Sequence, residues 1–399
     1  MDLIVVLASF MLILVFIKKG LDVGLTLFMA SLFLIFLLKP MVFINVFFEV
    51  LSSYSTWYLI LTSSLIAFLA ELYRLTTLIR DLGLSVARVL RSPKLAIVIT
   101  PAIIGLLPVA GGALMSAPIV EALSGILGFN SELAVYANVW FRHTIFLVYP
   151  LSSLMVTISA LTGTSIESLI FMQFPTSLFM ILIGYLITFH RRGGVHSSNM
   201  VLEKAKTPLW FSIMPLFISL VSAIFLRIFF GDFGMTLGVF LGVLTIIFIC
   251  RIDFRSILKA ASDRRVRNIA FTAFSTMLLQ KTFTLTGASS ILSNFLRGMG
   301  IPLMILEYFI PGVLGLFTGS PLTGIVLSLP IIGGFIDVSV KDISRVYISS
   351  YLFYIASPIH LCYVYTAQYF NSNLSRSYRY LIPSVLASLI FTIVLYSLT

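Results

Sequence analysis

Two stretches decide how this chain is interpreted: Pro108-Val-Ala-Gly-Gly-Ala-Leu-Met-Ser-Ala-Pro118 and Thr318-Gly-Ser-Pro-Leu-Thr-Gly324. Each interrupts a long apolar run, in which a membrane-spanning helix would otherwise be continuous. Glycine and proline at such a place free main-chain polar groups that lipid cannot satisfy, so the interruption survives only against protein or a water-filled cavity. Two interruptions at corresponding places in the two halves of a chain point to the binding site of a transporter.

The composition is that of a membrane protein. Of the 399 residues, 59% are hydrophobic and 10% are charged, and the mean hydropathy is +1.08. Repeated apolar runs of about 20 residues then predict an all-α polytopic membrane protein. The net charge of +11 gathers in loops 190–206 and 251–267, as expected of cytoplasmic loops, so nucleic-acid binding is not needed to explain it. The two cysteines, Cys250 and Cys362, offer neither a metal-ligand spacing nor a disulfide framework.

The apolar runs predict about ten transmembrane helices plus two re-entrant hairpins. The hairpins are assigned to 56–90 and 268–299, which are apolar but have polar centres, and the broken helices to 95–127 and 301–336. The stretch 251–267 mixes cations and apolar residues at helical spacing and is predicted to lie along the membrane surface. The predicted spans are 2–17, 21–38, 95–127, 131–161, 165–189, 207–230, 233–250, 301–336, 343–369 and 379–398.

The two halves of the chain match each other at a shift of 210 residues. Asp22-Val-Gly-Leu-Thr-Leu27 aligns with Asp232-Phe-Gly-Met-Thr-Leu237, and Pro101-Ala-Ile-Ile-Gly-Leu106 aligns with Pro311-Gly-Val-Leu-Gly-Leu316. We therefore predict two repeats, residues 1–189 and 207–399, joined by a cytoplasmic linker at 190–206. With re-entrant hairpins each half has five spans, an odd number that inverts the second repeat. With hairpins that cross the membrane fully, each half would have six spans and the repeats would be parallel.

The predicted binding site lies where the two hairpin tips and the two broken helices meet. Small hydroxyl residues and glycine at the tips can turn the chain and direct oxygen atoms at an ion, although a hydroxyl can equally satisfy its own helix. At a broken helix, the half that begins offers N–H groups to an anion, and the half that ends offers carbonyls to Na⁺. The candidate solute- and ion-binding residues are Thr76, Thr77, Pro108, Gly111, Gly112, Ser116, Arg142, His143, Thr284, Thr286, Ser289, Ser290, Thr318, Gly319, Ser320, Thr323 and His360. The candidates for Na⁺ among them are Thr76, Gly111, Thr286 and Gly319.

Ionisable residues inside predicted spans are functional candidates, because a charge in lipid is costly. Arg142 and His143 lie in the middle of the span 131–161, where they could bind a substrate carboxylate or form an internal ion pair. His360 could carry protons in a coupled cycle or serve as a hydrogen-bonded structural residue. Glu71 and Lys281 stand at matching places in the two halves, which suggests either a salt bridge between the hairpins or side chains that extend to the membrane interface.

Two halves that each hold a surface helix, a re-entrant hairpin and a broken helix resemble the ion transporter superfamily of citrate, dicarboxylate and gluconate permeases. The stretch Leu106-Leu-Pro-Val-Ala-Gly-Gly-Ala-Leu-Met-Ser-Ala-Pro118 is similar to an uncharacterised prokaryotic integral membrane family within that group. The resemblance implies a homodimeric, elevator-type carrier in the cell membrane of a prokaryote, whose tips and broken helices enclose the substrate. Dicarboxylate members carry Ser-Asn-Thr signatures at their tips; the equivalents here, Leu75–Thr77 and Thr284–Ser290, lack that triplet.

These features predict a secondary active transporter, not an enzyme, that moves a small, anionic, carboxylate-type solute by alternating access. Nothing in the sequence resembles a nucleotide-binding loop, so a Na⁺ or H⁺ gradient is the expected energy source, with no other cofactor. The expected partners are membrane lipid and the solute.

Two other functions remain open. A cation/proton antiporter would need a buried carboxylate, for which Glu71, Glu121 and Glu307 are the candidates. A remote alternative is an intramembrane serine hydrolase, which rests on Gly287-Ala-Ser-Ser290 with one of the intramembrane histidines as its base.

Overall fold

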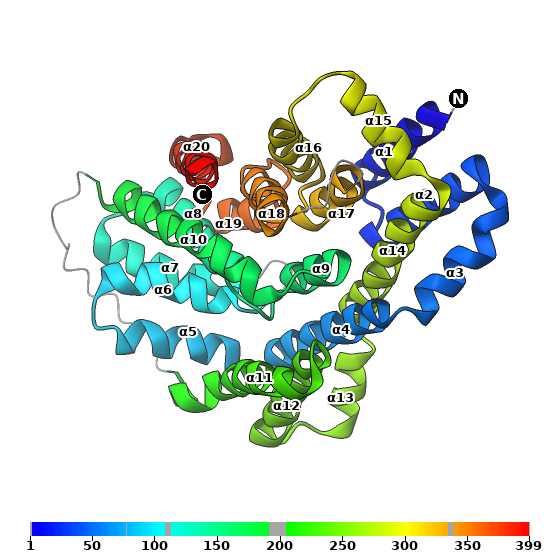
Figure 1. The fold of residues 1–399 in the computed structure, drawn as a ribbon. Coiled ribbons are helices and arrows are strands. Elements are labelled where there is room, and N and C mark those ends of the chain that lie inside the picture. Colours follow the sequence, from blue (N-terminus) through cyan, green and yellow to red (C-terminus); the bar gives the residue numbers. More distant parts are fainter. Residues whose placement is uncertain (1, 77, 108–112, 191–204, 334–338, 399) are drawn as a thin grey trace. The chain divides into compact units, whose positions relative to one another are not determined.

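The chain folds as a set of helices in the computed structural model, which describes residues 2–76, 78–107, 113–190, 205–333 and 339–398 (Figure 1). No β-strand occurs in that part of the chain. In the first half the helices are α1 (Asp2–Lys18), α2 (Val23–Leu38), η1 (Pro40–Val42), α3 (Phe43–Ser52), α4 (Tyr54–Leu75), α5 (Leu78–Val89), α6 (Pro93–Gly105), α7 (Ala113–Leu127), α8 (Ser131–Thr144), η2 (Ile145–Leu147), α9 (Ser153–Thr162) and α10 (Ile166–Phe189). In the second half they are α11 (Leu209–Phe230), α12 (Phe233–Cys250), α13 (Phe254–Ala261), α14 (Arg264–Thr286), α15 (Ala288–Gly298), α16 (Leu303–Thr318), α17 (Pro321–Ile332), α18 (Val340–Ile355), α19 (Leu361–Tyr369) and α20 (Leu374–Leu398).

The helices of the two halves keep the 210-residue spacing seen in the sequence. Four helices of the first half begin 210 residues before a helix of the second half: α2 before α12, α4 before α14, α5 before α15, and α6 before α16. The spacing of 210 residues that relates the two halves of the sequence therefore also relates the first residues of these helices. The inversion of the second half stays a prediction.

Five of the described helices are long and apolar enough to cross a membrane: α4, α10, α11, α12 and α20. The pair α15 and α16 gives a sixth candidate if it counts as one span, with its two helices bent by 120°. Several apolar helices of spanning length support a multi-pass membrane protein. The first arm of the predicted hairpin 56–90 is α4, which is long enough to span on its own, and the number of ten spans stays a prediction.

Two stretches predicted as spans, 131–161 and 343–369, are each interrupted and do not form single helices. The first breaks between α8 and α9, and the second between α18 and α19. Pro150 and Pro358 lie in these two gaps. Proline lacks the N–H that a helix needs and also disfavours the helical conformation of the residue before it, so a regular helix does not continue through either position.

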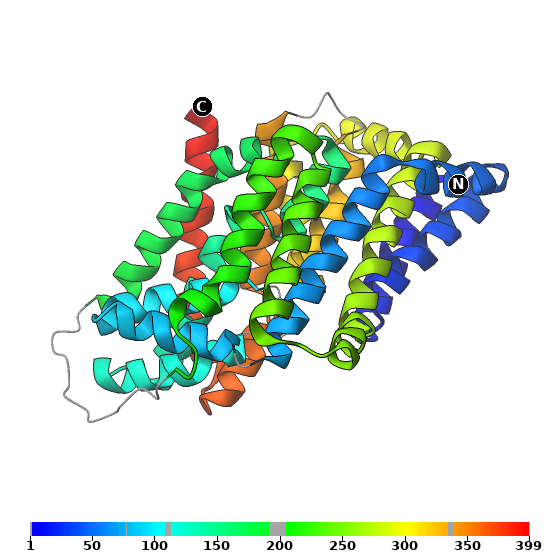
Figure 2. The same cartoon turned by 90° about the horizontal axis from the view of Figure 1, so that it is seen from below.

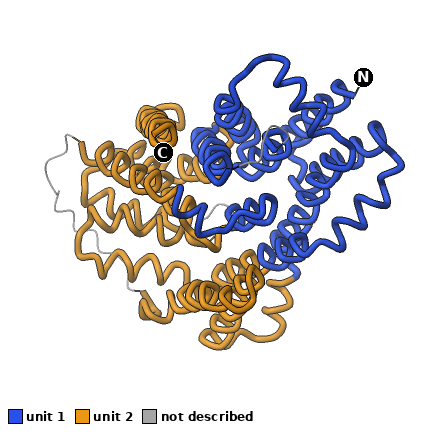
Figure 3. Tube along the Cα trace, in the orientation of Figure 1, with its two compact units in different colours: residues 1–64, 153–172, 262–357 blue, residues 65–152, 173–261, 358–399 orange. Residues whose placement is uncertain are grey.

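The chain forms two compact units, and each unit takes segments from both halves of the sequence (Figure 3). Unit 1 comprises residues 1–64, 153–172 and 262–357, and unit 2 comprises residues 65–152, 173–261 and 358–399. The two predicted repeats are therefore not the compact units. The repeats 1–189 and 207–399 describe the order of the sequence and stay a prediction.

Unit 1 is held together by an apolar core and by close contacts through glycine. Val6 of α1, Leu27 of α2, Phe283 of α14 and Leu327 of α17 share one buried cluster. The helices α16 and α18 approach so closely that a Cβ atom on Gly315 would lie 2.5 Å from the carbonyl oxygen of Ser350. Small residues at such contacts let helices pack in lipid, where burial of apolar surface alone does not favour association.

In unit 2, α11 and α12 also make close contacts through glycine, and they run side by side (Figure 2). Gly234, Gly238 and Gly242 recur at every fourth position of α12, so they share one helix face. A Cβ atom on Gly238 would lie 2.3 Å from the main-chain nitrogen of Ala223 in α11. The spacing is the small-xxx-small pattern that brings membrane helices into direct contact.

Candidate functional site

A cluster of buried polar side chains in unit 2 surrounds the break between α6 and α7. α6 ends at Gly105 with Leu106 as its C-cap, and α7 begins at Ala113, so the break falls inside the stretch predicted to be a broken helix. Three predicted binding residues belong to this break and lie outside the described residues: Pro108, Gly111 and Gly112. The side chains around the break come from α7, α8 and α19.

Arg142 meets the end of the first half-helix. Its side chain is 2% exposed, and its Nη2 donates a hydrogen bond to the carbonyl oxygen of Leu107 at 3.1 Å. Because the last carbonyls of a helix have no partner within it, a cationic donor there is favourable. The interruption at Pro150 puts Arg142 in the last turn of α8 rather than in the middle of a span.

Asn138, one helical turn before Arg142, connects three helices. Its Oδ1 accepts a hydrogen bond from the hydroxyl of Ser116 at 2.6 Å, and its Nδ2 donates to the carbonyl oxygen of Ala113 at 2.8 Å and to Oγ1 of Thr366 at 3.3 Å. Ser116 was predicted as a site residue, whereas Asn138 and Thr366 were missed. The spacing of four residues between Asn138 and Arg142 could have shown that both face the same side of α8.

Gly105 explains how α6 and α8 come close enough for these contacts. A Cβ atom on Gly105 would lie 2.6 Å from the carbonyl oxygen of Arg142. Gly105 stands 210 residues before Gly315, which makes the equivalent close approach in unit 1. The glycine in the repeated Pro101–Leu106 motif therefore has a packing role in both units.

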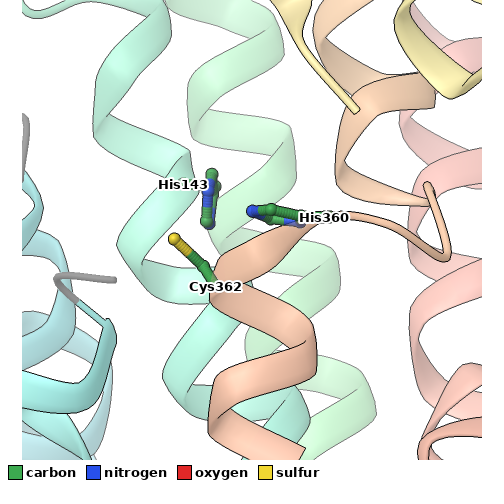
Figure 4. Close-up of side chains that lie close together, drawn as sticks. All are labelled: His143, His360 and Cys362. Carbon is green, nitrogen blue, oxygen red and sulfur yellow. The ribbon is translucent and has the colours of Figure 1, made fainter. Parts of the chain in front are cut away.

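His143 and His360 lie against each other in unit 2, and Cys362 lies beside them (Figure 4). The two imidazole rings are nearly perpendicular, with centroids 4.8 Å apart. His143 is at the end of α8, and His360 is the N-cap of α19, directly after the interruption at Pro358. Both predicted histidines are thus brought together, and Nδ1 of His143 lies 2.6 Å from the carbonyl oxygen of Val139.

Cys362 was not predicted as a site residue. Its partners are 219 and 2 residues away along the chain, so no search for cysteine spacing could find the group. The nearest sequence signal was Ser357-Pro358 before His360, which marks the start of a new helix.

The second break, between α16 and α17 in unit 1, gathers four predicted residues. Gly319 has a positive φ of 60°, which is why the chain can turn there. The hydroxyl of Ser320 caps α17 by accepting a hydrogen bond from the main-chain nitrogen of Thr323 at 3.2 Å. The hydroxyl of Thr318 donates to the carbonyl oxygens of Leu314 and Ser320. These oxygens lie at one helix break, and their role as ligands stays a prediction.

The hydroxyls of the predicted hairpin tips bond to their own helices. Thr284 and Thr286 donate to carbonyl oxygens four residues earlier, and Thr76 donates to that of Leu72 at 3.0 Å. Gly287, with φ of 81°, forms the turn between α14 and α15 inside the predicted tip. Ser289 is partly buried and Ser290 is exposed, while Thr77 lies outside the described residues.

Several ion pairs lie within the two units. Arg345 of α18 donates to Glu307 of α16 at 2.9 Å and to Asp342 at 3.0 Å, all within unit 1. Glu71 pairs with Arg74 on the same helix, and Lys281 pairs with Glu49 at 3.1 Å. The sequence did not predict the buried ion pair of Arg345.

A cavity of about 540 Å³ in unit 2 is apolar and adds no charged group to the polar cluster around Arg142. It is lined by apolar side chains of α6 and α10, with Thr144 and Tyr185 as its polar members. Such a surface suits lipid tails rather than an anionic solute.

Comparisons with known proteins support a transporter-like fold. The family described as "Protein of unknown function (DUF401)" matches residues 2–399. The crystal structure of the Alcanivorax borkumensis YdaH transporter, reported to reveal an unusual topology, is similar, with a TM-score of 0.65 and 13% sequence identity over 89% of this chain and 88% of that chain. No curated protein sequence matches. The similarity to YdaH concerns the fold alone, and the resemblance to citrate and dicarboxylate permeases stays a prediction.

Proposed function

Because this chain belongs to the DUF401 family, whose description assigns no function, we propose its function from its fold and its buried groups: it is a secondary active transporter. The fold that it shares with a transporter and its helices of spanning length support the proposal. We further propose that the protein has ten spans in two inverted repeats. It would work by an elevator-type movement, as a homodimer in the cell membrane of a prokaryote. These finer features come from the sequence argument.

Our proposal for the solute rests on the buried guanidinium of Arg142. A cation inside a membrane protein is costly and is retained where it binds or moves charge. The planar fork of a guanidinium can hold a carboxylate through two parallel hydrogen bonds. We therefore propose a small, carboxylate-type anion as the solute and Arg142 as its main ligand.

The neighbouring helix end favours the same charge. α7 begins at Ala113, so its first amide groups carry the partial positive charge of a helix N-terminus. Asn138 holds this end in place through Ser116 and the carbonyl oxygen of Ala113. An anion between α7 and Arg142 would be attracted by both groups.

Coupling to Na⁺ or to H⁺ has a structural candidate in each case. For Na⁺, the break at Gly319 offers the oxygens of Thr318, Ser320 and Thr323, and oxygen is the ligand that such a hard cation prefers. For H⁺, the candidates are the adjacent rings of His143 and His360, whose centroids are 4.8 Å apart, because an imidazole can carry a proton. Thr76, Thr286 and Gly111 remain proposed Na⁺ ligands from the sequence.

Uptake into proteoliposomes tests this proposal. Labelled small carboxylates are offered under an imposed Na⁺ gradient, an imposed H⁺ gradient, or neither. We expect uptake with one gradient only, and its loss in Arg142→Gln. Arg376→Gln, which changes an exposed arginine in the first turn of α20, is the matched control and should transport normally. No uptake and no dissipation of either gradient would refute a transporter of this class.

A cation/proton antiporter is a second candidate because one carboxylate is fully buried. Glu307 is 0% exposed and is paired with Arg345, whereas Glu121 is exposed and accepts a hydrogen bond from Tyr369 at 2.8 Å. Exchange measured with a pH-sensitive dye should disappear in Glu307→Gln if this carboxylate carries the proton. Full exchange in that variant would count against the antiporter.

We propose no hydrolase activity. Near the tip that contains Ser289, the hydroxyls of Thr284, Thr286 and Ser293 donate to main-chain carbonyl oxygens.

A further inference from the structure

We propose that His143, His360 and Cys362 bind one thiophilic transition-metal ion, for which Zn²⁺ is the representative probe. This site does not bind the transported solute, but it uses the two histidines proposed above for H⁺ coupling, so a stably bound ion favours coupling to Na⁺. One ligand atom from each residue lies within 4.8 Å of the other two (Figure 4). Two imidazole nitrogens and one sulfur form a ligand set that suits Zn²⁺ or Cu⁺ and does not suit Na⁺ or Mg²⁺, which prefer oxygen.

The distances fit a site that closes slightly on its ion. With bonds of about 2.0–2.1 Å to nitrogen and about 2.3 Å to sulfur, ligand atoms around Zn²⁺ are roughly 3.4–3.8 Å apart. The present spread of up to 4.8 Å therefore requires a contraction of about 1 Å. Rotation of side chains alone can supply it, because Cys362 lies in the first turn of α19 and is only partly buried.

The hydrogen bond of His143 prepares one of the ligands. Nδ1 of His143 lies 2.6 Å from the carbonyl oxygen of Val139, which accepts the proton when Nδ1 carries it. In that tautomer the lone pair used for coordination is on Nε2. Histidine ligands in metal sites commonly donate their other ring N–H to a main-chain carbonyl in this way, which fixes the orientation of the ring.

The helix that carries the other two ligands is tied to α8. Thr366, one helical turn after Cys362, accepts a hydrogen bond from Asn138 of α8 at 3.3 Å. His360 and Cys362 are therefore held opposite His143 by a contact that does not involve the ligands. A metal-bound thiolate in the first turn of α19 would also face the positive end of the helix dipole, which stabilises negative charge.

Three protein ligands leave one coordination position for a water or an anion, as in zinc sites that act on small molecules. A divalent ion with one thiolate and two neutral imidazoles has a net charge of +1. Arg142 adds a second positive charge beside His143 in the sequence. An anionic fourth ligand is therefore favoured over a neutral one.

Metal binding by the full-length protein in detergent tests the proposal, with an affinity tag that contains no histidine. After loading and desalting, we expect one Zn²⁺ per chain by elemental analysis. Loading with Co²⁺ should produce a thiolate-to-metal charge-transfer band in the near ultraviolet. Cys362→Ser, which changes only sulfur to oxygen, should abolish that band, and His143→Ala and His360→Ala should each reduce the bound metal to background.

Two control variants separate this site from adventitious binding. Cys250→Ser removes the only other cysteine, and His190→Ala with His196→Ala removes the only other histidines, which belong to the loop between the halves. Both controls should retain one Zn²⁺ per chain and the Co²⁺ band. Zn²⁺ should also raise the melting temperature of the wild type but not of Cys362→Ser, provided both elute as single species. Wild-type protein without stoichiometric metal, or equal binding in Cys362→Ser, would overturn the proposal.

Discussion

Arg142 donates a hydrogen bond from its Nη2 to the main-chain carbonyl oxygen of Leu107, 3.1 Å away, and so joins the end of α8 to the end of the half-helix α6. The contact places a permanent positive charge at a helix break inside unit 2. A charged donor at the carbonyl end of a helix also stabilises that helix. Binding and stability therefore depend on the same side chain.

Replacing Arg142 with glutamine should lower both stability and transport. Loss of a charged donor to a buried carbonyl costs about 1.5–3 kcal/mol in the free energy of unfolding, measured by denaturation in detergent. Arg142→Lys keeps the charge without the planar fork, so it should recover more stability than transport. The exposed Arg376→Gln should change stability by less than about 0.5 kcal/mol. Equal effects of the changes at Arg142 and Arg376 would contradict the role of the contact.

Replacing Asn138 with alanine should destabilise unit 2. The change removes the partners of Ser116, Ala113 and Thr366 at a position that is 0% exposed, so a loss of about 1–3 kcal/mol per unsatisfied group is expected. Thermal unfolding followed by scattering or intrinsic fluorescence gives the measurement. Asn294→Ala changes an exposed asparagine of α15 and should leave the melting temperature unchanged. A similar shift in both variants would show that Asn138 is not a structural connector.

Replacing Gly105 with alanine should separate α6 from α8. The added Cβ would meet the carbonyl oxygen of Arg142 at 2.6 Å, and because that atom belongs to the backbone, a helix has to move. Overpacking of this kind costs about 1–3 kcal/mol. Gly298→Ala at the end of α15 is the control, because a Cβ there meets no atom within 4 Å. The prediction fails if both variants unfold at the same denaturant concentration.

Replacing Arg345 with methionine should be strongly destabilising. It leaves the fully buried Glu307 without its cation, and removal of one partner of a buried pair costs about 3–5 kcal/mol. Asp342 keeps its bonds to Ser339 in the capping box of α18, so the effect is expected to come from Glu307. The double variant Glu307→Leu/Arg345→Met should therefore be more stable than Arg345→Met alone. A double variant that is less stable would show that the two changes act independently.

Much of the helical framework follows from local sequence. Apolar runs bounded by glycine, proline and capping residues predict where helices begin and end, as at Gly287 and Gly319, because these signals act within a few residues of the chain. The matching motifs Pro101–Leu106 and Pro311–Leu316 contain Gly105 and Gly315, which have the same packing role. Pro150 and Pro358 are local signals of the same kind, and they lie in the interruptions of 131–161 and 343–369.

The partners of the buried polar groups could not be found in this way. Three contacts join residues that no sequence periodicity relates: Cys362 with His143, Arg345 with Glu307, and Arg142 with Leu107. Such pairs depend on which helices pack against each other, and each compact unit here mixes helices from both halves of the chain. Local propensity and burial patterns shape single helices, whereas packing between distant segments brings together the side chains of the candidate site.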